Sequence, residues 1–316
     1  MNTLSSEERN ALKDSVSKLM SDASTEAEVR RVMETAQGFD LDLWRALSEM
    51  GVIGLITDEK FGGSGVGPME LEAVMEETGA ALLCSPLLAS GVIAAELLQA
   101  LGDETLNADL MPRVATGETI ASAVITGDRG CWTESGVDIS ATALEGGWQL
   151  EGRGNYVLHA QNADVLIVIA NTESGLAAYA VDPSDDAVQI EALPTLDRTL
   201  RIASVRFSGA SAKQINATRP VWEAVSQALN LALVALAGEQ AGGAKKVLDF
   251  TVEYAKTRIQ FGRQIGSFQA IKHMAADLLV ETESAISAAR ATFLGPSAPM
   301  KIGTSARRGW VMARSG

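Results

Sequence analysis

Residues 254–277 read YAKTRIQFGRQIGSFQAIKHMAAD, and two amphipathic helical patterns meet within this stretch. The loop between them, residues 259–266, contains two glycines and no proline. The pattern predicts that Arg258 lies at the C-terminal end of the first helix. It also predicts that Ser267 caps the N-terminus of the second helix, with Gln269 in its first turn.

The predicted loop gathers groups that suit a phosphate or pyrophosphate. Arg258 offers a planar fork of donors, Gln260 and Gln269 offer amides, and the free N–H groups of a helix N-terminus carry partial positive charge. Phe261 offers a flat apolar face to a ring. The residues alone leave a second interpretation open, in which Arg258 only ends a helix before a glycine-containing loop.

The string R-x-Q-F-G-x-x-I-x-x-F-Q-A-I-x-x-x-x-A-D in this stretch closely resembles the signature of the acyl-CoA dehydrogenase family of flavoproteins. In that family the loop reaches across a subunit interface and holds the FAD of the neighbouring subunit. The resemblance implies that Arg258 meets the pyrophosphate of FAD, while Gln260, Phe261 and Gln269 complete the grip.

The composition is that of an ordinary globular protein. The chain has 316 residues, of which 47% are apolar and 21% charged. That length allows about two or three domains and a sizeable core. The formal net charge of -14 disfavours nucleic acid as a partner, although local arginines and helix ends can still bind an anionic CoA ester.

Cysteine and histidine usage argues against disulfide bonds and metal sites. Only Cys84 and Cys131 occur, which favours a reducing compartment. His159 and His273 stand far apart without neighbouring ligands, so we expect no metal. The N-terminus MNTLSSEERN is unlike a signal peptide, and no apolar run approaches the about 20 residues of a membrane span. These features predict a cytoplasmic protein without a membrane span.

Residues 1–118 predict a helical N-terminal domain, because apolar residues such as Val16, Met20, Trp44 and Leu47 follow a helical spacing. A glycine-rich break, GVIGLITDEKFGGSGVG, lacks the Lys and Ser/Thr of a P-loop, which disfavours nucleotide binding there. The passage W-x-x-L-x-x-M-G-V-x-G-L, followed by FGG and EETG, also resembles the N-terminal domain of acyl-CoA dehydrogenases.

From residue 119 the pattern changes to short β-rich runs, separated by turn residues at intervals of about 8 to 12 residues. Gly146 and Gly147, between two alternating runs, predict a hairpin. The spacing predicts a small antiparallel β-barrel or sandwich over residues 119–214. In the resembled family, such a middle domain holds the flavin ring and part of the acyl substrate.

This middle region departs from the family pattern at two places. The family's T-E-P-x-x-G-S turn is replaced around residues 125–129, and its L-N-G-x-K-x-W-I-T pattern appears as LEGRGNYVL. By the resemblance, Tyr156 stands at the tryptophan that covers the flavin face, and Leu158 at the threonine whose hydroxyl bonds flavin N5. Tyr156 can still stack, but Leu158 cannot donate a hydrogen bond. We therefore expect a degraded flavin pocket on this chain.

From residue 215 the helical period returns and predicts a partial helical bundle over residues 215–294. The glycines at 238, 242 and 243 predict close approach of another helix or subunit. Residues 295–316 form an irregular tail with cationic and no acidic residues. Family members continue here with further helices, so the resemblance predicts a C-terminally truncated or frame-shifted member.

The family's chemistry removes a proton from C2 of an acyl-CoA thioester while a hydride leaves C3 for flavin N5. The base must lie within hydrogen-bond reach of C2 in a dry pocket. One family base position lies beyond the end of this chain, and the other falls on Ala232. Glu239 lies on the same helix face about 10 Å further along, too far to substitute. We therefore expect no catalytic residue in this chain.

These features predict an α+β protein that acts as a subunit of an FAD-dependent acyl-CoA dehydrogenase and is inactive as an isolated chain. The resemblance implies a homologous full-length subunit that supplies the glutamate, and electron-transfer flavoprotein as electron acceptor. Short, base-lacking members include ones that act on steroid side-chain CoA esters, so the acyl group is either a fatty chain or bulkier. Two alternatives stay open: a non-catalytic structural or binding subunit of the same fold, and an acyl-CoA oxidase-like flavoprotein.

Overall fold

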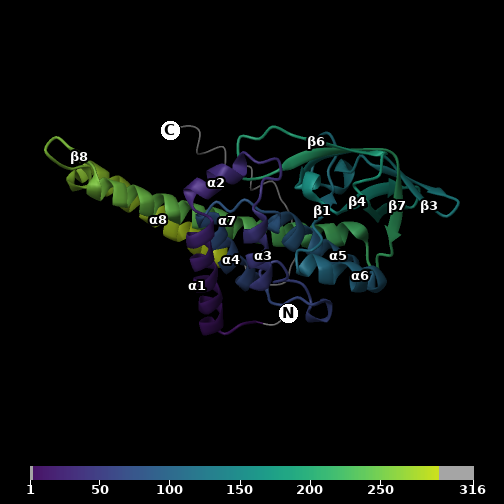
Figure 1. Cartoon of the computed structure of the whole chain (residues 1–316), viewed down its shortest axis with the longest axis horizontal. Helices are drawn as coiled ribbons and strands as arrows, with labels where there is room; N and C mark the ends of the chain where they lie inside the picture. Colours follow the sequence, from purple (N-terminus) through teal and green to yellow (C-terminus); the bar gives the residue numbers. More distant parts are fainter. Residues whose placement is uncertain (1–2, 292–316) are drawn as a thin grey trace.

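The computed structural model of the protein describes residues 3–291. In chain order, a group of helices is followed by a β-sheet and then by two long helices (Figure 1). The first helices are α1 (Ser6–Ala23), α2 (Glu26–Met33), α3 (Leu41–Glu49), α4 (Pro68–Ala80), α5 (Ala95–Leu101) and α6 (Glu104–Ala115). This order confirms the helix-plus-sheet composition and the helical C-terminal region. The predicted tail, residues 295–316, and residues 292–294 of the predicted bundle lie outside the described range.

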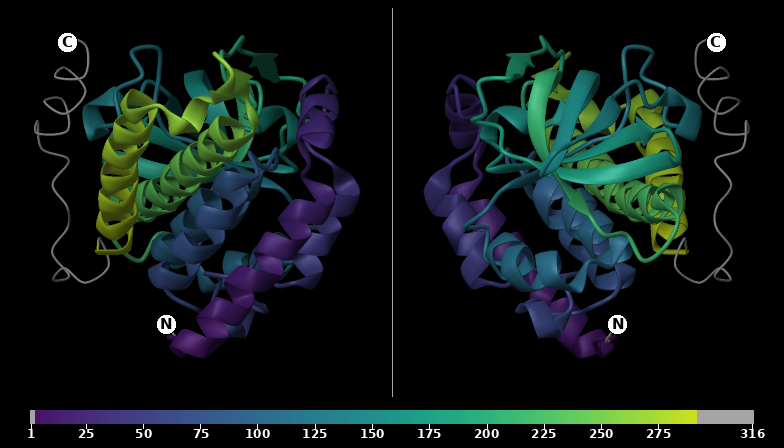
Figure 2. Two further views of the ribbon diagram at one scale, coloured as in Figure 1. Left: turned by 90° about the vertical axis from the view of Figure 1, so that its left-hand side faces the viewer. Right: turned by 90° about the vertical axis from the view of Figure 1, so that its right-hand side faces the viewer.

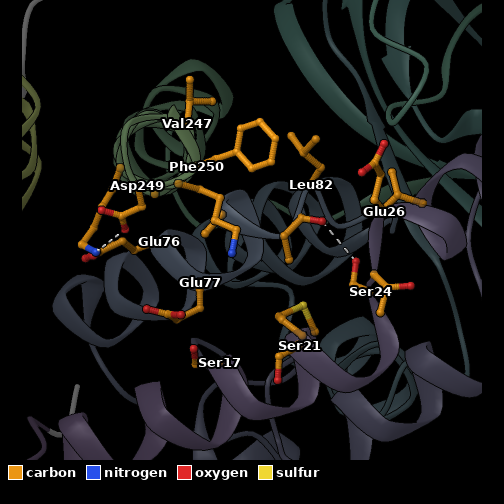
Figure 3. A pocket seen from close by; sticks show the side chains of 18 of the residues that line it. Ser17, Ser21, Ser24, Glu26, Glu76, Glu77, Leu82, Val247, Asp249 and Phe250 are labelled. Atoms are coloured by element: carbon orange, nitrogen blue, oxygen red, sulfur yellow. Dashed lines mark hydrogen bonds and ion pairs between the residues drawn. The ribbon is translucent and has the colours of Figure 1, made fainter. Parts of the chain in front are cut away.

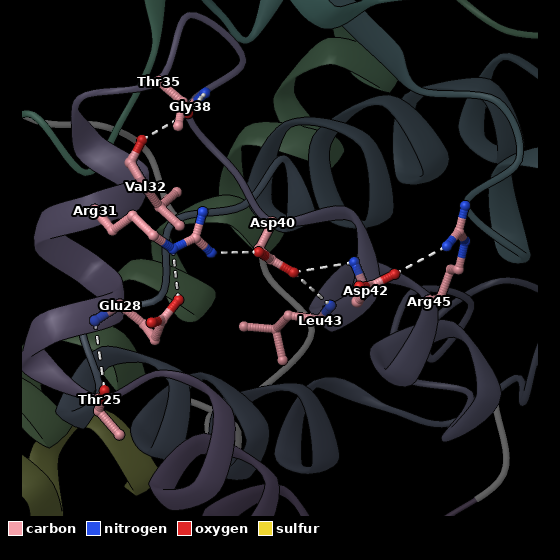
Figure 4. A network of polar contacts seen from close by, with 10 residues as sticks. All are labelled: Thr25, Glu28, Arg31, Val32, Thr35, Gly38, Asp40, Asp42, Leu43 and Arg45. Carbon is pink, nitrogen blue, oxygen red and sulfur yellow. Dashed lines mark hydrogen bonds and ion pairs between the residues drawn. The ribbon is translucent and has the colours of Figure 1, made fainter.

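Side-chain caps fix where the short helices begin. Asp40 accepts hydrogen bonds from the N–H groups of Asp42 and Leu43 at the start of α3 (Figure 4). Arg31 joins α2 to this cap, because its guanidinium lies 2.7 Å from Glu28 and 2.6 Å from Asp40. The Leu43 N–H and the Arg31 guanidinium hold the pKa of Asp40 below its usual value. The network orients α2 against α3, but such exposed ion pairs contribute little stability.

The apolar segment after Pro86 begins as something other than a regular α-helix. Its first half, η2 (Leu87–Ala94), is a π-helix that is buried throughout. Within it, the hydroxyl of Ser90 accepts a hydrogen bond from the N–H of Ala121 at 3.0 Å, which ties this helix to the sheet. The sequence did not reveal the wider turn, because the same apolar run fits either helix type.

The strands form one seven-stranded sheet whose central part closes on itself. They are β1 (Ala121–Val124), β2 (Ser140–Leu144), β3 (Gly147–Leu158), β4 (Val165–Thr172), β5 (Gly175–Val181), β6 (Val188–Ala192) and β7 (Ile202–Ile215). Strands β4, β2, β3, β7 and β5 pair in a ring, and β1 and β6 attach to β4 and β7. The predicted hairpin is confirmed: β2 and β3 are joined through Glu145 and Gly146, which has a φ of 92°.

The prediction of an antiparallel sheet is wrong at β4, which pairs in parallel with both β1 and β2. The β2–β3 hairpin separates β1 from β4 along the chain, and β4 re-enters the sheet in the same direction as β1. Its other neighbour, β5, is antiparallel to it. Period-2 alternation reports which face a side chain occupies but not the strand direction, so the sequence pattern did not reveal this pairing.

Helix α7 (Val221–Thr257) lies against α4 at backbone contact distance. A methyl group added at Gly242 would overlap the carbonyl oxygen of Glu76. One added at Gly238 would lie 2.8 Å from the carbonyl oxygen of Glu72. The predicted close approach of another helix at Gly238 and Gly242 is thus confirmed.

Two further glycines show how local this contact is. A methyl group at Gly79 of α4 would overlap the backbone of Glu239 on α7. In contrast, the nearest atom to a methyl group at Gly243 lies 3.7 Å away, an ordinary contact. Gly243 therefore does not serve the helix crossing.

Helices α7 and α8 (Gln269–Ala291) continue past this crossing as an arm that projects from the body (Figure 1). The two helices lie side by side (Figure 2). On α8 the buried residues are Thr282, Ile286 and Ala289, and the last two pack on Ala241 of α7. Large apolar side chains along the arm are exposed: Val247, Phe250, Tyr254, Met274, Leu278, Leu279 and Val280. Among residues 3–291, α7 has the length and apolar composition of a membrane span, but 56% of its most apolar stretch is buried inside the protein.

The α4–α7 contact predicts opposite effects for two adjacent substitutions. Gly242→Ala should lower the free energy of unfolding by about 1–3 kcal/mol, because the added methyl group forces the helices apart. Gly243→Ala, the matched control, should leave it unchanged or raise it by up to about 1 kcal/mol, because alanine is the better helix former. Urea unfolding followed by circular dichroism measures both. Equal effects of the two changes would contradict the contact.

Candidate functional site

The candidate loop between α7 and α8 is a tight β-hairpin rather than an irregular loop. Strand β8 (Ile259–Gln260) pairs with β9 (Arg263–Gln264). The two turn residues, Phe261 and Gly262, have φ angles of 54° and 78°, which suits a two-residue hairpin of the primed type. Arg258 ends α7 as predicted, with its N–H donating to the carbonyl of Tyr254 at 2.9 Å. Arg258 and Gln260 are therefore held at the base and on one strand of a rigid turn.

The predicted cap by Ser267 is wrong. Ser267 lies in the 3-10 turn η5 (Ile265–Ser267), and its hydroxyl donates to the carbonyl of Gln264 at 2.6 Å. The turn is closed by the N–H of Phe268 bonding to Ile265, so Ser267 sits one residue too early to cap α8. Helix α8 begins at Gln269, which confirms the predicted place of Gln269 in its first turn.

The hairpin presents its side chains to solvent. Phe261 is 91% exposed, and Arg258 and Gln260 are also exposed. The amide nitrogen of Gln269 lies 2.9 Å from Nε2 of His273 on the next turn of α8. The four loop residues predicted to contact a cofactor thus lie together, on one exposed end of the arm.

Arg263 is a candidate that the sequence analysis missed. Its guanidinium carbon lies 4.0 Å from the centroid of the Phe268 ring. That ring packs edge-to-face on Phe261 with 6.1 Å between centroids. The strand pairing sets Arg263 directly opposite Gln260. An F-G pair read as a two-residue turn would have indicated this pairing.

The other predicted cofactor-contacting residues lie on β3, in the sheet, whereas the hairpin projects from the far end of the arm (Figure 1). The ladder between β3 and β7 shifts register between Gly154 and Val157, so Tyr156 bulges out of it with a φ of 58°. Tyr156 is half-exposed. The chain therefore does not bring its two groups of predicted residues onto one surface.

The altered turn at residues 125–129 packs directly beside Tyr156. The N–H of Asn155 donates to the carbonyl of Thr126 at 2.8 Å, and its side-chain amide donates to Asp128 at 2.8 Å. A methyl group added at Gly130 would lie 2.7 Å from the Tyr156 ring. The two places where the sequence departs from the family pattern are thus one surface in space.

Leu158 contributes a backbone acceptor and an apolar side chain. Its carbonyl accepts a hydrogen bond from the hydroxyl of Ser122 at 2.5 Å, and its half-buried side chain packs on the helical core. The next residue, His159, is buried, and burial followed by the charge of Arg201 lowers its pKa to about 4. His159 is therefore neutral at pH 7.

On α7, the residue at the family's base position, Ala232, is buried. Ala232 lies in the helical core beside Ala228 and Ala235. Glu239 is the partly buried carboxyl on this helix, and burial followed by the charge of Asp197 raises its pKa. Its backbone lies against Gly79, where α4 ends.

A cavity of about 940 Å³ lies between α1, α2, the end of α4 and α7 (Figure 3). Its lining mixes apolar side chains, hydroxyls and charges. Within the lining, Glu76 lies 2.8 Å from Lys13 and 2.8 Å from Arg290 of α8. Burial works to raise the pKa of Glu76, but hydrogen bonds from these two cations outweigh it and lower the pKa.

Known families match the two helical regions. Residues 6–118 match the acyl-CoA dehydrogenase N-terminal domain, and residues 222–298 match the acyl-CoA dehydrogenase C-terminal domain. The chain is 33% identical over 294 residues to the acyl-CoA dehydrogenase IpdE2 of Mycolicibacterium smegmatis, covering 92% of this chain and 78% of that relative. The chain belongs to the acyl-CoA dehydrogenase family.

Two solved structures are similar to the chain. The ChsE4–ChsE5 complex from Mycobacterium tuberculosis is 28% identical, with a TM-score of 0.80 over 94% of this chain and 80% of that chain. A variant of the steroid ACAD Tcur3481–Tcur3483 is 27% identical, with a TM-score of 0.78 over 92% of this chain and 79% of that chain.

The raised pKa of Glu239 predicts a pH-dependent effect of Glu239→Gln. In the folded protein this carboxyl holds its proton to higher pH than in the unfolded chain, so its ionisation costs stability as the pH rises. The variant should match the wild type near about pH 4 and become the more stable protein towards about pH 8. Urea unfolding across this pH range measures the difference. The control is Glu223→Gln at an exposed position of the same helix, and an equal gain there would refute the assignment.

Proposed function

We propose that this chain is a subunit of an FAD-dependent acyl-CoA dehydrogenase that catalyses α,β-desaturation of an acyl-CoA thioester. The observation that carries the proposal is the α7–α8 hairpin, which presents Arg258, Gln260 and Phe261 away from the body of its own chain. A cofactor-binding hairpin that faces away from its own chain suits a cofactor held mainly by another subunit. FAD is the cofactor that the family motif implies.

The residues at the hairpin fit a dinucleotide cofactor. Arg258 supplies a planar fork for a pyrophosphate, and no ion pair within residues 3–291 occupies its guanidinium. Gln260 and Gln269 add amide donors, and Phe261 offers an exposed ring face. Arg263, stacked on Phe268, adds a second fixed cation at the same turn. These residues would bind and orient the cofactor, which accepts the hydride of the reaction.

On this chain's own sheet, the surface expected to contact the flavin lacks one of the family's hydrogen-bond donors. Tyr156 would still stack on a ring, since it is held outward by its bulge and by the turn at residues 125–129. Leu158 supplies no hydroxyl. A ring bound there would lose the hydrogen bond to N5 that orients it, so we propose that this surface does not hold a working flavin.

Proton abstraction requires a carboxylate within hydrogen-bond reach of C2 of the acyl group. Ala232 occupies the α7 position, and we propose that a homologous full-length subunit provides the glutamate. Glu239 is displaced by about two helical turns from Ala232. A non-catalytic binding subunit is the second candidate, and the same two residues, Ala232 and Leu158, favour it.

The partner proposal is supported by the exposed apolar side chains of the arm and by the ChsE4–ChsE5 complex among the similar structures. We propose a hetero-oligomer in the cytoplasm that passes its electrons to electron-transfer flavoprotein. The likeness to a steroid ACAD favours a bulky acyl group over a simple fatty chain.

We further propose a division into a helical N-terminal domain at residues 1–118, a β middle domain at 119–214 and a helical C-terminal domain at 215–294. Residues 295–316 would follow as a tail. The support is the position of the boundaries between α6 and β1 and between β7 and α7.

The proposed contact between Arg258 and the FAD pyrophosphate predicts that Arg258→Ala weakens FAD binding by about 30-fold or more. Loss of a charged hydrogen-bond partner costs about 2–5 kcal/mol of binding free energy. Equilibrium titration of the assembled apoprotein, followed by flavin fluorescence, measures the affinity. Lys256→Ala is the matched control, because this nearby cation pairs with Glu253 instead. Unchanged FAD affinity in Arg258→Ala would refute the role of Arg258.

The missing base predicts that the purified chain alone does not bleach flavin when mixed with acyl-CoA esters under anaerobic conditions. Adding a full-length homologous subunit should restore bleaching, with a flavin content near one per pair of chains. Absorbance at the flavin bands measures both. Rapid reduction by the isolated chain, or two flavins per pair, would contradict the proposal.

A further inference from the structure

We propose that the outer face of strands β3, β7 and β6 binds a phosphate group between Arg153 and Arg206, supplied by inorganic phosphate or by a small phosphate ester. The three strands lie side by side, because β7 pairs with both β3 and β6 (Figure 1). The inference goes beyond the proposed function, since it involves neither the α7–α8 hairpin nor the acyl group.

Arg153 of β3 lies directly opposite Arg206 of β7 in the antiparallel ladder. Residues opposed in this way have Cα atoms about 4.5–5.5 Å apart and side chains on the same face of the sheet. That face is the outer one, because Val205 and Phe207, which flank Arg206, are buried in the core of the ring. Two positive side chains therefore stand next to each other on the outside of the sheet.

No carboxylate of the described chain balances these two charges. Within residues 3–291, neither guanidinium forms an ion pair or a side-chain hydrogen bond, and the buried Nε of Arg153 has no partner. Glu151 and Glu191 are exposed at neighbouring positions of β3 and β6, but neither lies within ion-pair distance of an arginine. Like charges opposed across two strands are destabilising, and a buried charged donor without a partner adds to that cost. An anion between the arginines would remove both costs.

The charge and the shape of the site favour a phosphate dianion. Each guanidinium is a planar fork that can bind two phosphate oxygens at once. One dianion balances both arginines, whereas a carboxylate or sulfonate monoanion leaves one positive charge unbalanced. Gln189 lies opposite Arg206 on β6, and Ser208 lies two residues further along β7. Both are exposed, so they can add an amide and a hydroxyl donor to the same anion.

The site is separate from the proposed cofactor-binding hairpin. Arg153 and Arg206 belong to the sheet, whereas the hairpin that carries Arg258 lies at the far end of the arm (Figure 1). A phosphate bound on the sheet would therefore leave the hairpin free.

The test titrates the full chain, with its partner subunit where it needs one and with FAD in excess, so that the hairpin is not open to the probes. The probes are inorganic phosphate, phenyl phosphate and benzenesulfonate, at about pH 8 and about 0.15 M ionic strength, and calorimetry gives each Kd. Both phosphates should bind with a Kd of about 1 mM or lower. Benzenesulfonate, which carries a similar ring but a single charge, should bind about tenfold more weakly.

Two further comparisons use the same probes. Phosphate binding should weaken below about pH 6, where a phosphate monoester takes up a second proton and loses one charge. Tighter binding of phenyl phosphate than of inorganic phosphate would assign the site to an ester, and equal binding would assign it to the phosphate group alone.

Arg206→Gln and Arg153→Gln should each raise the Kd for phenyl phosphate by about tenfold or more, because each removes charged hydrogen bonds to the anion. Lys213→Gln is the matched control: Lys213 is exposed on the same strand, and the change removes one positive charge, so the Kd should stay the same. Without phosphate, Arg206→Gln should leave the urea midpoint unchanged or higher, because it removes a like charge from the ladder. This second measurement separates binding from folding.

Three results would overturn the inference. They are no saturable binding of phenyl phosphate up to about 10 mM, benzenesulfonate binding as tight as that of phenyl phosphate, and an equal loss of affinity in Lys213→Gln. None of them bears on FAD binding, which Arg258→Ala tests separately.

Discussion

The contact between the backbones of α4 and α7 is the constraint on which the rest of the structure depends. Glycines at positions 79, 238 and 242 remove the side chains that would otherwise hold the two helices apart. The closeness buries a row of carboxyls on α4. Glu70 pairs with Arg9, and Glu76 pairs with cations from α1 and α8. Burial, followed by the charge of Glu76, raises the pKa of Glu72. Beside the crossing, these ion pairs join α4 to α1 and α8.

The same constraint produces the arm. The first half of α7 lies in the core. The helix has 37 residues, so its second half extends beyond α4. There α8 is the main neighbour, and a pair of helices without further cover leaves apolar side chains in water. An exposed, apolar arm that carries the proposed cofactor-binding hairpin at its tip fits the proposal that this chain is a subunit of a larger assembly. Arg290, near the C-terminal end of α8, joins the arm to Glu76 of α4.

The sequence predicted those features that depend on local spacing. Apolar periodicity and caps such as Asp40 located the helices, and Gly146 located the β2–β3 hairpin. The motif located Arg258 at the end of α7. Features set by tertiary context were missed: the parallel pairing of β4, the π-helix η2, and the shift of Ser267 into a 3-10 turn. Arg263 was missed because its position depends on the Phe261–Gly262 turn, and the cavity was missed because its walls come from four separate helices.

Backbone strain links the three candidate surfaces. Leu82, Tyr156 and Phe261 all have positive φ angles, and all three side chains are exposed. Each such residue costs about 1–2 kcal/mol relative to glycine, which would adopt the same backbone freely. A side chain that is strained and also largely in water offsets only part of this cost. The compensation must then come from something that covers the side chain. For Phe261, the cover would be the flavin cofactor proposed above.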